Sequence, residues 1–183
     1  MTTTEMDYAR EQPRVLVIEP NRNYLAVIAR RLGEFGYRIA TADSAQAGLA
    51  ELYRIPADLV LCDIKLPGTS GIEFVRMIRH DVVHRDVPVL LVVGRSDPAS
   101  AIRAFQAGAD SVVRKPCPFE VLAACIARHI ERAATIKRLA HDNAALDARV
   151  ISRAIELKEM REQLSATERD RRRLKAIVEK QAA

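Results

Sequence analysis

The sequence predicts an α/β fold in which five parallel strands form a doubly wound sheet and the last helix extends into a long coiled coil. Two observations predict this architecture. Short aliphatic runs alternate with helical patterns as far as residue 133, and no proline or glycine occurs from Phe119 to Ala183. The alternation is typical of a parallel sheet with helices on both faces, and the second pattern is typical of one uninterrupted helix.

The predicted strands are short aliphatic runs bounded by turn residues. We expect them at Arg14–Ile18, Tyr37–Thr41, Asp58–Cys62, Val87–Val93 and Asp110–Val113. The third run is followed by Pro67-Gly68 and has the composition of a buried parallel strand.

The predicted helices fill the gaps between these strands. We expect them at Asn23–Phe35, at Ala45–Tyr53, at Gly71–His80, from Asp97-Pro98 to Gly108, and from Pro118 onward. Gly36 ends the first helix and Ser44 caps the second. Pro98 suits the first position of its helix because its missing N–H has no acceptor there.

Composition sets limits on the class of protein. The chain has 183 residues, of which 49% are hydrophobic and only 4% aromatic, with no Trp, so the core must be aliphatic. We expect a flexible tail over residues 1–12, a domain over residues 13–133 and a helix over residues 134–183. Of the net charge of +5, residues 136–183 carry +4, from 12 basic and 8 acidic side chains.

The three cysteines have neither metal-binding spacing nor a disulfide framework, which favours a reduced cytoplasmic setting. A membrane span requires about 18 consecutive apolar residues, and no stretch of the sequence reaches that length. No membrane partner is therefore expected.

Three charged side chains follow predicted strands. Glu19 follows the first, Asp63 the third and Lys115 the fifth. Open α/β sheets place their chemistry at the carboxyl ends of the strands, so these residues form the candidate site. The structural alternative is that Asp63 caps a loop or pairs with Lys115 without any chemistry.

At this point the chain resembles the receiver domain of two-component response regulators over roughly residues 13–133. The resemblance rests on the order and spacing of four segments: Val15–Glu19, Asp58–Gly71, Pro88–Val93, and Ala107–Asp110 followed by Lys115-Pro116. It implies a flavodoxin-like fold that takes a phosphoryl group from a histidine kinase or a phosphotransfer protein onto an aspartate, with Mg²⁺ as the cofactor.

The resemblance also implies residue roles. Asp63 matches the phosphoacceptor, and Lys115 matches the lysine that contacts the phosphoryl oxygens. Glu19, Asp63 and the main-chain carbonyl of Lys65 match the metal ligands. The Lys115-Pro116 peptide bond is expected to be cis.

Three positions depart from the family pattern. Pro20 stands where a second acid is expected as a direct metal ligand, which weakens the metal site. Val93 replaces the Ser or Thr hydroxyl that reports phosphorylation, and Val112 replaces the aromatic switch residue. The usual coupling between hydroxyl and aromatic ring therefore cannot operate in this chain.

A heptad pattern from Ile136 onward predicts a two-stranded parallel coiled coil. Nine of thirteen a and d positions between residues 136 and 178 are apolar, and the register does not slip. The predicted dimer interface consists of Ile136, Leu139, Asn143, Leu146, Val150, Leu157, Met160, Leu164, Leu174 and Val178. Asn143 at an a position favours in-register pairing. The alternative is a single solvated helix, or one folded back on the domain.

The sequence therefore predicts a receiver that is phosphorylated on Asp63 and signals to an unknown downstream protein through a dimeric coiled coil. It predicts no enzymatic output domain, and no catalysis beyond the receiver's own phosphorylation and dephosphorylation. The alternative is a scaffold or adaptor of receiver fold that works without phosphorylation. Nucleic-acid binding through the basic helix is disfavoured, because the Arg169–Arg173 cluster lacks interleaved aromatic residues.

Overall fold

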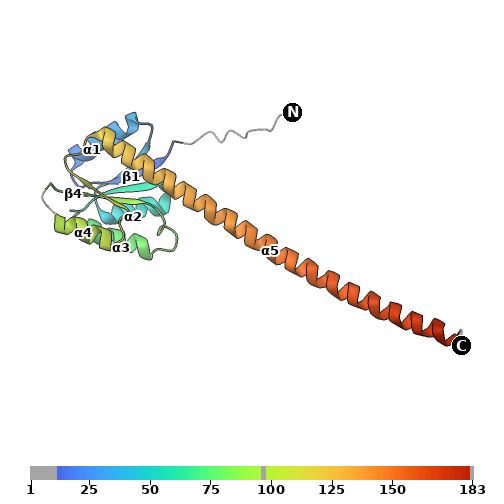
Figure 1. The fold of residues 1–183 in the computed structure, drawn as a ribbon. Helices are drawn as coiled ribbons and strands as arrows, with labels where there is room; N and C mark the ends of the chain where they lie inside the picture. Colours follow the sequence, from blue (N-terminus) through green and yellow to red (C-terminus); the bar gives the residue numbers. More distant parts are fainter. Residues whose placement is uncertain (1–11, 96–97, 182–183) are drawn as a thin grey trace, which may run out of the picture. The chain divides into compact units, whose positions relative to one another are not determined.

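The fold is a five-stranded parallel sheet, as predicted. The computed structural model describes residues 12–95 and 98–181. The strands are β1 (Arg14–Ile18), β2 (Arg38–Ala42), β3 (Leu59–Asp63), β4 (Val89–Val93) and β5 (Ser111–Arg114). Their order in the sheet is β2-β1-β3-β4-β5 (Figure 1). Each lies within two residues of its expected bounds, and β4 begins only after Pro88.

Helices connect the strands, and short polar side chains cap several of them. The helices are α1 (Arg22–Glu34), α2 (Ala45–Arg54), α3 (Gly71–His80), α4 (Pro98–Gln106) and α5 (Phe119–Gln181). Ser44 accepts a hydrogen bond from the Ala47 amide at the start of α2, as expected. Ser70 and Glu73 cap α3 reciprocally. Asp97, expected to open α4, lies outside the described residues, as do residues 1–11 of the expected tail.

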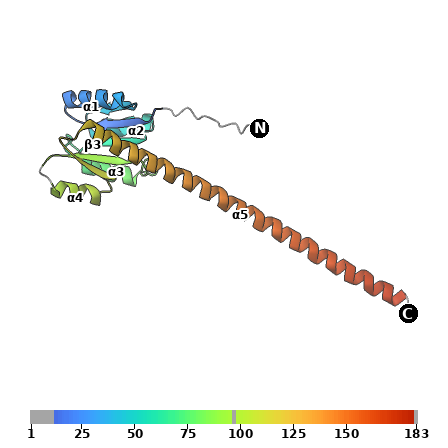
Figure 2. The same ribbon diagram turned by 45° about the horizontal axis from the view of Figure 1, so that its top comes forward.

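Helices cover both faces of the sheet (Figures 1 and 2). Successive strand residues point to opposite faces, so each strand contributes to two apolar clusters. In one cluster, Leu16 and Cys62 lie with Phe74 and Ile78 of α3. The other cluster packs α1 and the first turns of α5 against the sheet, and its members include Val17, Leu61, Ile28, Leu32, Leu122 and Ile126.

The core is aliphatic, as the composition predicted. Among the described residues, Phe74 is the only aromatic side chain in the buried hydrophobic core. Helix α2 approaches the sheet closely at Gly48, where a β-carbon would overlap the Ile18 side chain. The sheet is therefore held at both faces by close packing, which fixes the positions of its strand ends.

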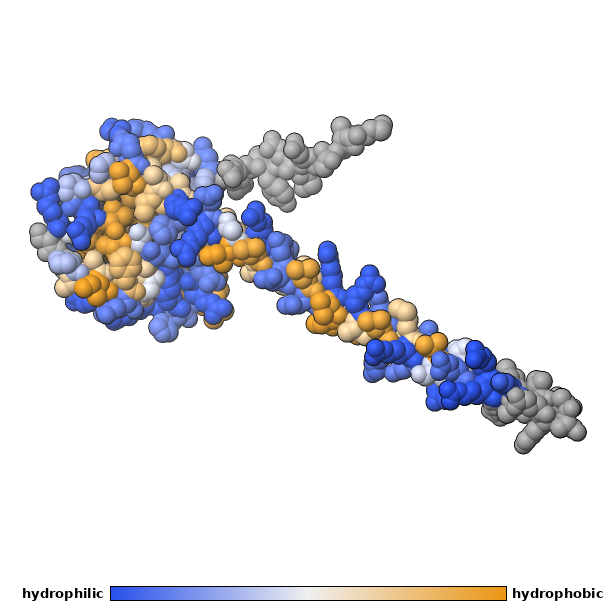
Figure 3. Space-filling view, viewed as in Figure 1, coloured by the Kyte–Doolittle hydropathy of each residue, from blue (hydrophilic) through white to orange (hydrophobic). Residues whose placement is uncertain are grey.

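The chain divides into two units between Thr135 and Ile136. Residues 119–135 of α5 belong to the first unit, and residues from 136 onward form the second. Apolar side chains recur along this second part of α5 (Figure 3). Among the described residues, no helix is both long and apolar enough to cross a membrane.

Candidate functional site

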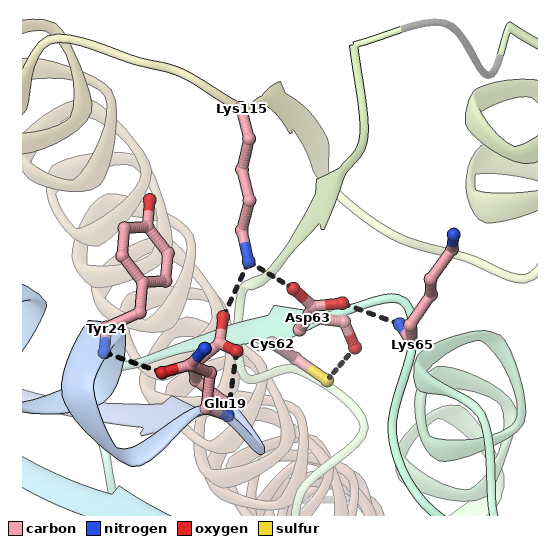
Figure 4. Close-up of polar contacts among 7 residues, drawn as sticks. Glu19, Tyr24, Cys62, Asp63, Lys65 and Lys115 are labelled. Atoms are coloured by element: carbon pink, nitrogen blue, oxygen red, sulfur yellow. Dashed lines mark hydrogen bonds and ion pairs between the residues drawn. The ribbon is translucent and has the colours of Figure 1, made fainter.

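Glu19, Asp63 and Lys115 meet at the carboxyl edge of the sheet (Figure 4). Asp63 is the last residue of β3, and Glu19 directly follows β1. The register pairs Ile18 with Cys62, so the next residue on each strand carries a carboxylate at the same level. Lys115 follows β5, two strands further along the sheet, and its long side chain reaches both acids.

The Lys115 ammonium bridges the two carboxylates. Its Nζ lies 2.6 Å from Glu19 Oε2 and also pairs with Asp63 Oδ2. Burial lowers the pKa of Lys115, but hydrogen bonds to Asp63 and Glu19 and the charges of both outweigh burial and raise it. Lys115 therefore stays protonated, and its ammonium lies between two acidic side chains.

The Asp63 carboxylate is held in a defined orientation. Its Oδ1 accepts a hydrogen bond from the Lys65 main-chain amide at 2.6 Å, and its Oδ2 contacts Lys115. Only 9% of Asp63 is exposed. Gly71, at the start of α3, packs directly on the Asp63 main chain, so the loop after β3 closes tightly behind the carboxylate.

Cys62 neighbours the site but is not equipped to act in it. Its side chain is fully buried, and burial raises the pKa of its thiol well above the ordinary value, with smaller effects from Asp63 and Glu19. Its Sγ donates to the Asp63 carbonyl oxygen at 3.3 Å. Cys62 therefore stays a neutral thiol and packs as a small buried hydrophobe.

A pocket of about 490 Å³ opens beside the cluster. It is lined by Glu19, Asn21, Tyr24, Arg95, Lys115 and Pro116. Sequence reasoning missed Tyr24 and Arg95 as site residues, since Tyr24 only adds to the helical pattern of α1 and Arg95 lies two residues beyond β4. The structure brings their side chains to the same pocket as Lys115, so the pocket has both a cationic and an aromatic wall.

The Lys115 ammonium also contacts the ring of Tyr24. Its Nζ lies 4.4 Å from the ring centroid, within the range of a cation–π interaction. Burial raises the pKa of the Tyr24 phenol, the Lys115 charge lowers it, and the charges of Glu19, Cys117 and Asp63 raise it. The pKa of the Tyr24 phenol therefore depends on the charges of Glu19, Asp63 and Lys115.

The three positions that depart from the family pattern supply no polar side chain to the site. Val93 ends β4 with a buried side chain, and its carbonyl accepts the Lys115 amide at 2.9 Å. Val112 is half-buried and packs against the core on the side of α3. Pro20 is exposed next to Glu19. No serine or threonine of the described residues lines the pocket.

The donor set for a metal is small. The described residues contain no group of three or more His, Cys, Asp or Glu side chains that could hold a metal ion. Glu19 and Asp63 are the two acids at the site, and each of their four oxygens already accepts one hydrogen bond. A carboxylate oxygen has two lone pairs, so both groups retain the capacity to bind a cation.

The Lys115-Pro116 bond is cis, as the resemblance implied.

Comparison with known proteins gives a consistent result. A family model described as response regulator receiver domain matches residues 15–127. The chain is 30% identical over 151 residues, 82% of its length, to a probable cyclic di-GMP phosphodiesterase of Vibrio cholerae, of which it covers 34%. It is 38% identical over 109 residues, 57% of its length, to the transcriptional regulatory protein AruR of Pseudomonas aeruginosa, of which it covers 43%.

A solved response regulator receiver domain protein from Clostridium thermocellum superimposes with a TM-score of 0.64 at 28% identity. That match covers 68% of this chain and 98% of the solved chain. The first three curated relatives are longer proteins, of which this chain spans between 34% and 50%.

Proposed function

This chain belongs to the response regulator receiver domain family, and we propose that it accepts a phosphoryl group on Asp63 and signals through a coiled-coil dimer of its C-terminal helix. The donor is a histidine kinase or a phosphotransfer protein. The observation that supports this proposal best is the Lys115 ammonium in contact with both Glu19 and Asp63 at the edge of an open pocket.

The transfer is a displacement at phosphorus. A carboxylate oxygen of Asp63 forms a bond to phosphorus as the bond between phosphorus and the donor imidazole nitrogen breaks, and the imidazole retains that electron pair. Lys115 is placed to move from the carboxylates onto the phosphoryl oxygens as a point charge. The Lys65 amide, 2.6 Å from Asp63 Oδ1, keeps the carboxylate oriented during the attack.

Mg²⁺ is part of this proposal. Glu19, Asp63 and the carbonyl of Lys65 would hold it, with water as the remaining ligands, since Mg²⁺ commonly binds through only one or two protein carboxylates. When bound, the ion neutralises charge that develops on the phosphoryl oxygens. Pro20 adds no ligand, so we expect this affinity to be weak.

The coiled-coil output rests on the exposed apolar positions of α5. The a and d residues Ile136, Leu139, Val150 and Leu157 are between 55% and 67% exposed in the single chain. Leu146, Met160 and Leu164 are exposed to a similar degree. Burying the exposed part of such a side chain against a second helix would contribute about 1–2 kcal/mol. The side chains of Leu174 and Val178 lie outside the described residues.

The alignment with the Vibrio cholerae protein also supports a signalling role for the helix. It covers 151 residues of this chain, more than the 135 that precede Ile136, so it extends into the second unit. That relative is described as a probable cyclic di-GMP phosphodiesterase, and its similarity to this chain continues past the receiver into the residues with the heptad pattern. We propose that the helix of this chain passes a signal to a partner protein.

Phosphorylation is tested by exposing the full chain to acetyl phosphate and Mg²⁺ and measuring intact mass. The wild type should gain one phosphoryl group, and Asp63→Asn should gain none. Asp86→Asn is the matched control, because Asp86 is an exposed aspartate whose side chain is 80% accessible. A wild type that gains no phosphoryl group at high Mg²⁺ concentration would overturn the proposal.

A second candidate function is a scaffold of receiver fold that works without phosphorylation. It is favoured by Pro20, Val93 and Val112, and by an ion-pair cluster in which Lys115 already pairs with both carboxylates. Titration calorimetry with Mg²⁺ separates the two candidates. Millimolar binding that is lost in Glu19→Ala supports the phosphoacceptor, whereas no binding in the wild type supports the scaffold.

A further inference from the structure

Tyr24 is the third partner of the Lys115 ammonium, and the family pattern does not account for it. The geometry points to Tyr24 as a positioning residue that holds Lys115 and transmits phosphorylation of Asp63 to α1 and from there to α5. This inference rests on the proposed phosphorylation of Asp63. It supplies the readout that Val93 and Val112 cannot provide, because neither carries a hydroxyl or an aromatic ring.

The first step is the movement of Lys115. In the unmodified site its ammonium lies between Glu19 Oε2, Asp63 Oδ2 and the Tyr24 ring. A phosphoryl group on Asp63 adds negative charge and new oxygens, which attract the ammonium away from its present position. The Lys115 side chain is 30% exposed and therefore has room to move. A cation–π contact acts within about 6 Å of the ring, so a displaced ammonium releases Tyr24.

The second step is the connection from the site to α1. Asn21 caps α1, where its Oδ1 accepts the Tyr24 amide at 3.0 Å. The Asn21 amide in turn donates to Glu19 Oε1 at 3.1 Å. The first turn of α1 is therefore attached to the acid cluster through its cap as well as through the Tyr24 ring. A change in the position of Lys115 alters both contacts.

The third step is the contact between α1 and the first turns of α5. Ile28 and Leu32 of α1 lie in the same apolar cluster as Leu122 and Ile126 of α5. Arg31 pairs with Glu120 at 3.6 Å and lies 5.6 Å from the Phe119 ring centroid. Beyond the end of α1, the Tyr37 hydroxyl donates to the Ala123 carbonyl of α5 at 3.1 Å.

The native tyrosines allow a direct test. Tyr24 reports at the site, Tyr37 reports at α5, and Tyr53 reports on the far side of the sheet, where its ring packs on His84. The full chain is labelled with ¹³C at the tyrosine ring ε carbons and observed by NMR with Mg²⁺, before and after addition of beryllofluoride. Beryllofluoride is the probe because it mimics a phosphoryl group on an aspartate.

In the wild type, beryllofluoride should shift the Tyr24 and Tyr37 resonances and leave Tyr53 in place, and Asp63→Asn should show no change. Tyr24→Phe keeps the ring and should keep the Tyr37 shift. Tyr24→Leu removes the ring, so Tyr37 should stay unshifted although beryllofluoride still binds, as monitored by ¹⁹F NMR.

Two outcomes would overturn the inference while leaving the proposed function intact. One is beryllofluoride bound to the wild type with no shift of Tyr24. The other is a Tyr37 shift of wild-type size in Tyr24→Leu. Failure of beryllofluoride to bind the wild type at all would overturn the proposed function, and the inference with it. Should Tyr24→Leu not fold, the Tyr24 and Tyr37 responses of the wild type and the Tyr37 response of Tyr24→Phe decide the matter.

Discussion

Gly71 packs against the main chain of Asp63 so closely that there is no room for a side chain. A β-carbon on Gly71 would overlap the Asp63 carbonyl oxygen and stand 2.9 Å from the Ile64 Cα. The obstructing atoms are backbone, which cannot move aside as a flexible side chain does. The first residue of α3 is therefore coupled sterically to the residue that we propose as the phosphoacceptor.

Gly71→Ala should destabilise the first unit by about 1–3 kcal/mol, because the loop after β3 must shift to accept the methyl group. It should also slow labelling of Asp63 by acetyl phosphate. Urea unfolding and intact mass measure the two effects. Gly33→Ala is the control, since a β-carbon there meets nothing within 4 Å. Equal stability of the two variants would show that a methyl group at position 71 does not clash with the Asp63 main chain.

Lys115→Met should destabilise the protein by about 3 kcal/mol, since it leaves the carboxylates of Glu19 and Asp63 buried without a counter-charge. Adding Glu19→Gln to that variant should restore part of the loss because it removes one of the unpaired charges. Chemical denaturation of the single and double variants checks this. A double variant less stable than Lys115→Met would show that the two acids do not repel one another.

Pro20→Asp should strengthen Mg²⁺ binding, because it adds a carboxylate next to Glu19. We expect a gain of about tenfold, by analogy with the roughly 10–100-fold loss of affinity that follows when a partner of a metal ligand is removed. Calorimetry with Mg²⁺ measures it, with Pro20→Asn as an uncharged control. An unchanged affinity would show that residue 20 does not face the metal position.

Leu157→Asp should convert the full chain from dimer to monomer in sedimentation experiments, because it places a charge in the predicted seam. Ile155→Asp is a matched control. Leu157 and Ile155 are 56% and 55% exposed in the single chain, so they differ in heptad position rather than in accessibility. Similar sedimentation of the two variants, or a monomeric wild type at micromolar concentration, would contradict the coiled-coil dimer.

The contact between Tyr53 and Asp81 predicts a dependence of stability on pH. The hydrogen bond from Tyr53 is the main cause that lowers the pKa of Asp81 from 3.8 to about 2. A group whose pKa is lower in the folded state stabilises the fold above its unfolded pKa and loses that contribution as the pH falls through the folded value.

The stability difference between wild type and Tyr53→Phe should therefore be constant near neutral pH and shrink as the pH falls from 3.8 towards 2. Urea unfolding across this pH range measures it. A difference that does not vary with pH would show that the hydrogen bond does not depend on the Asp81 charge.

The position of each strand and helix could be predicted from the sequence because these elements follow local patterns. The aliphatic runs, the cap at Ser44 and the turn at Gly36 act over a few residues, and the observed bounds agree closely with those expected. The meeting of Glu19, Asp63 and Lys115 was predictable as well, since parallel strands bring their carboxyl ends to one edge.

Only the tertiary structure decided how the side chains at that edge contact one another. Tyr24 and Lys115 are far apart in the chain, and nothing in the helical pattern of α1 marks Tyr24 as a site residue. Their contact depends on how α1 crosses the sheet and where the chain after β5 turns. Contacts of this kind arise from packing between elements that are distant in the chain. The sequence alone determined the strands, the helices and the acids at the site. The fold determined the neighbours of Lys115.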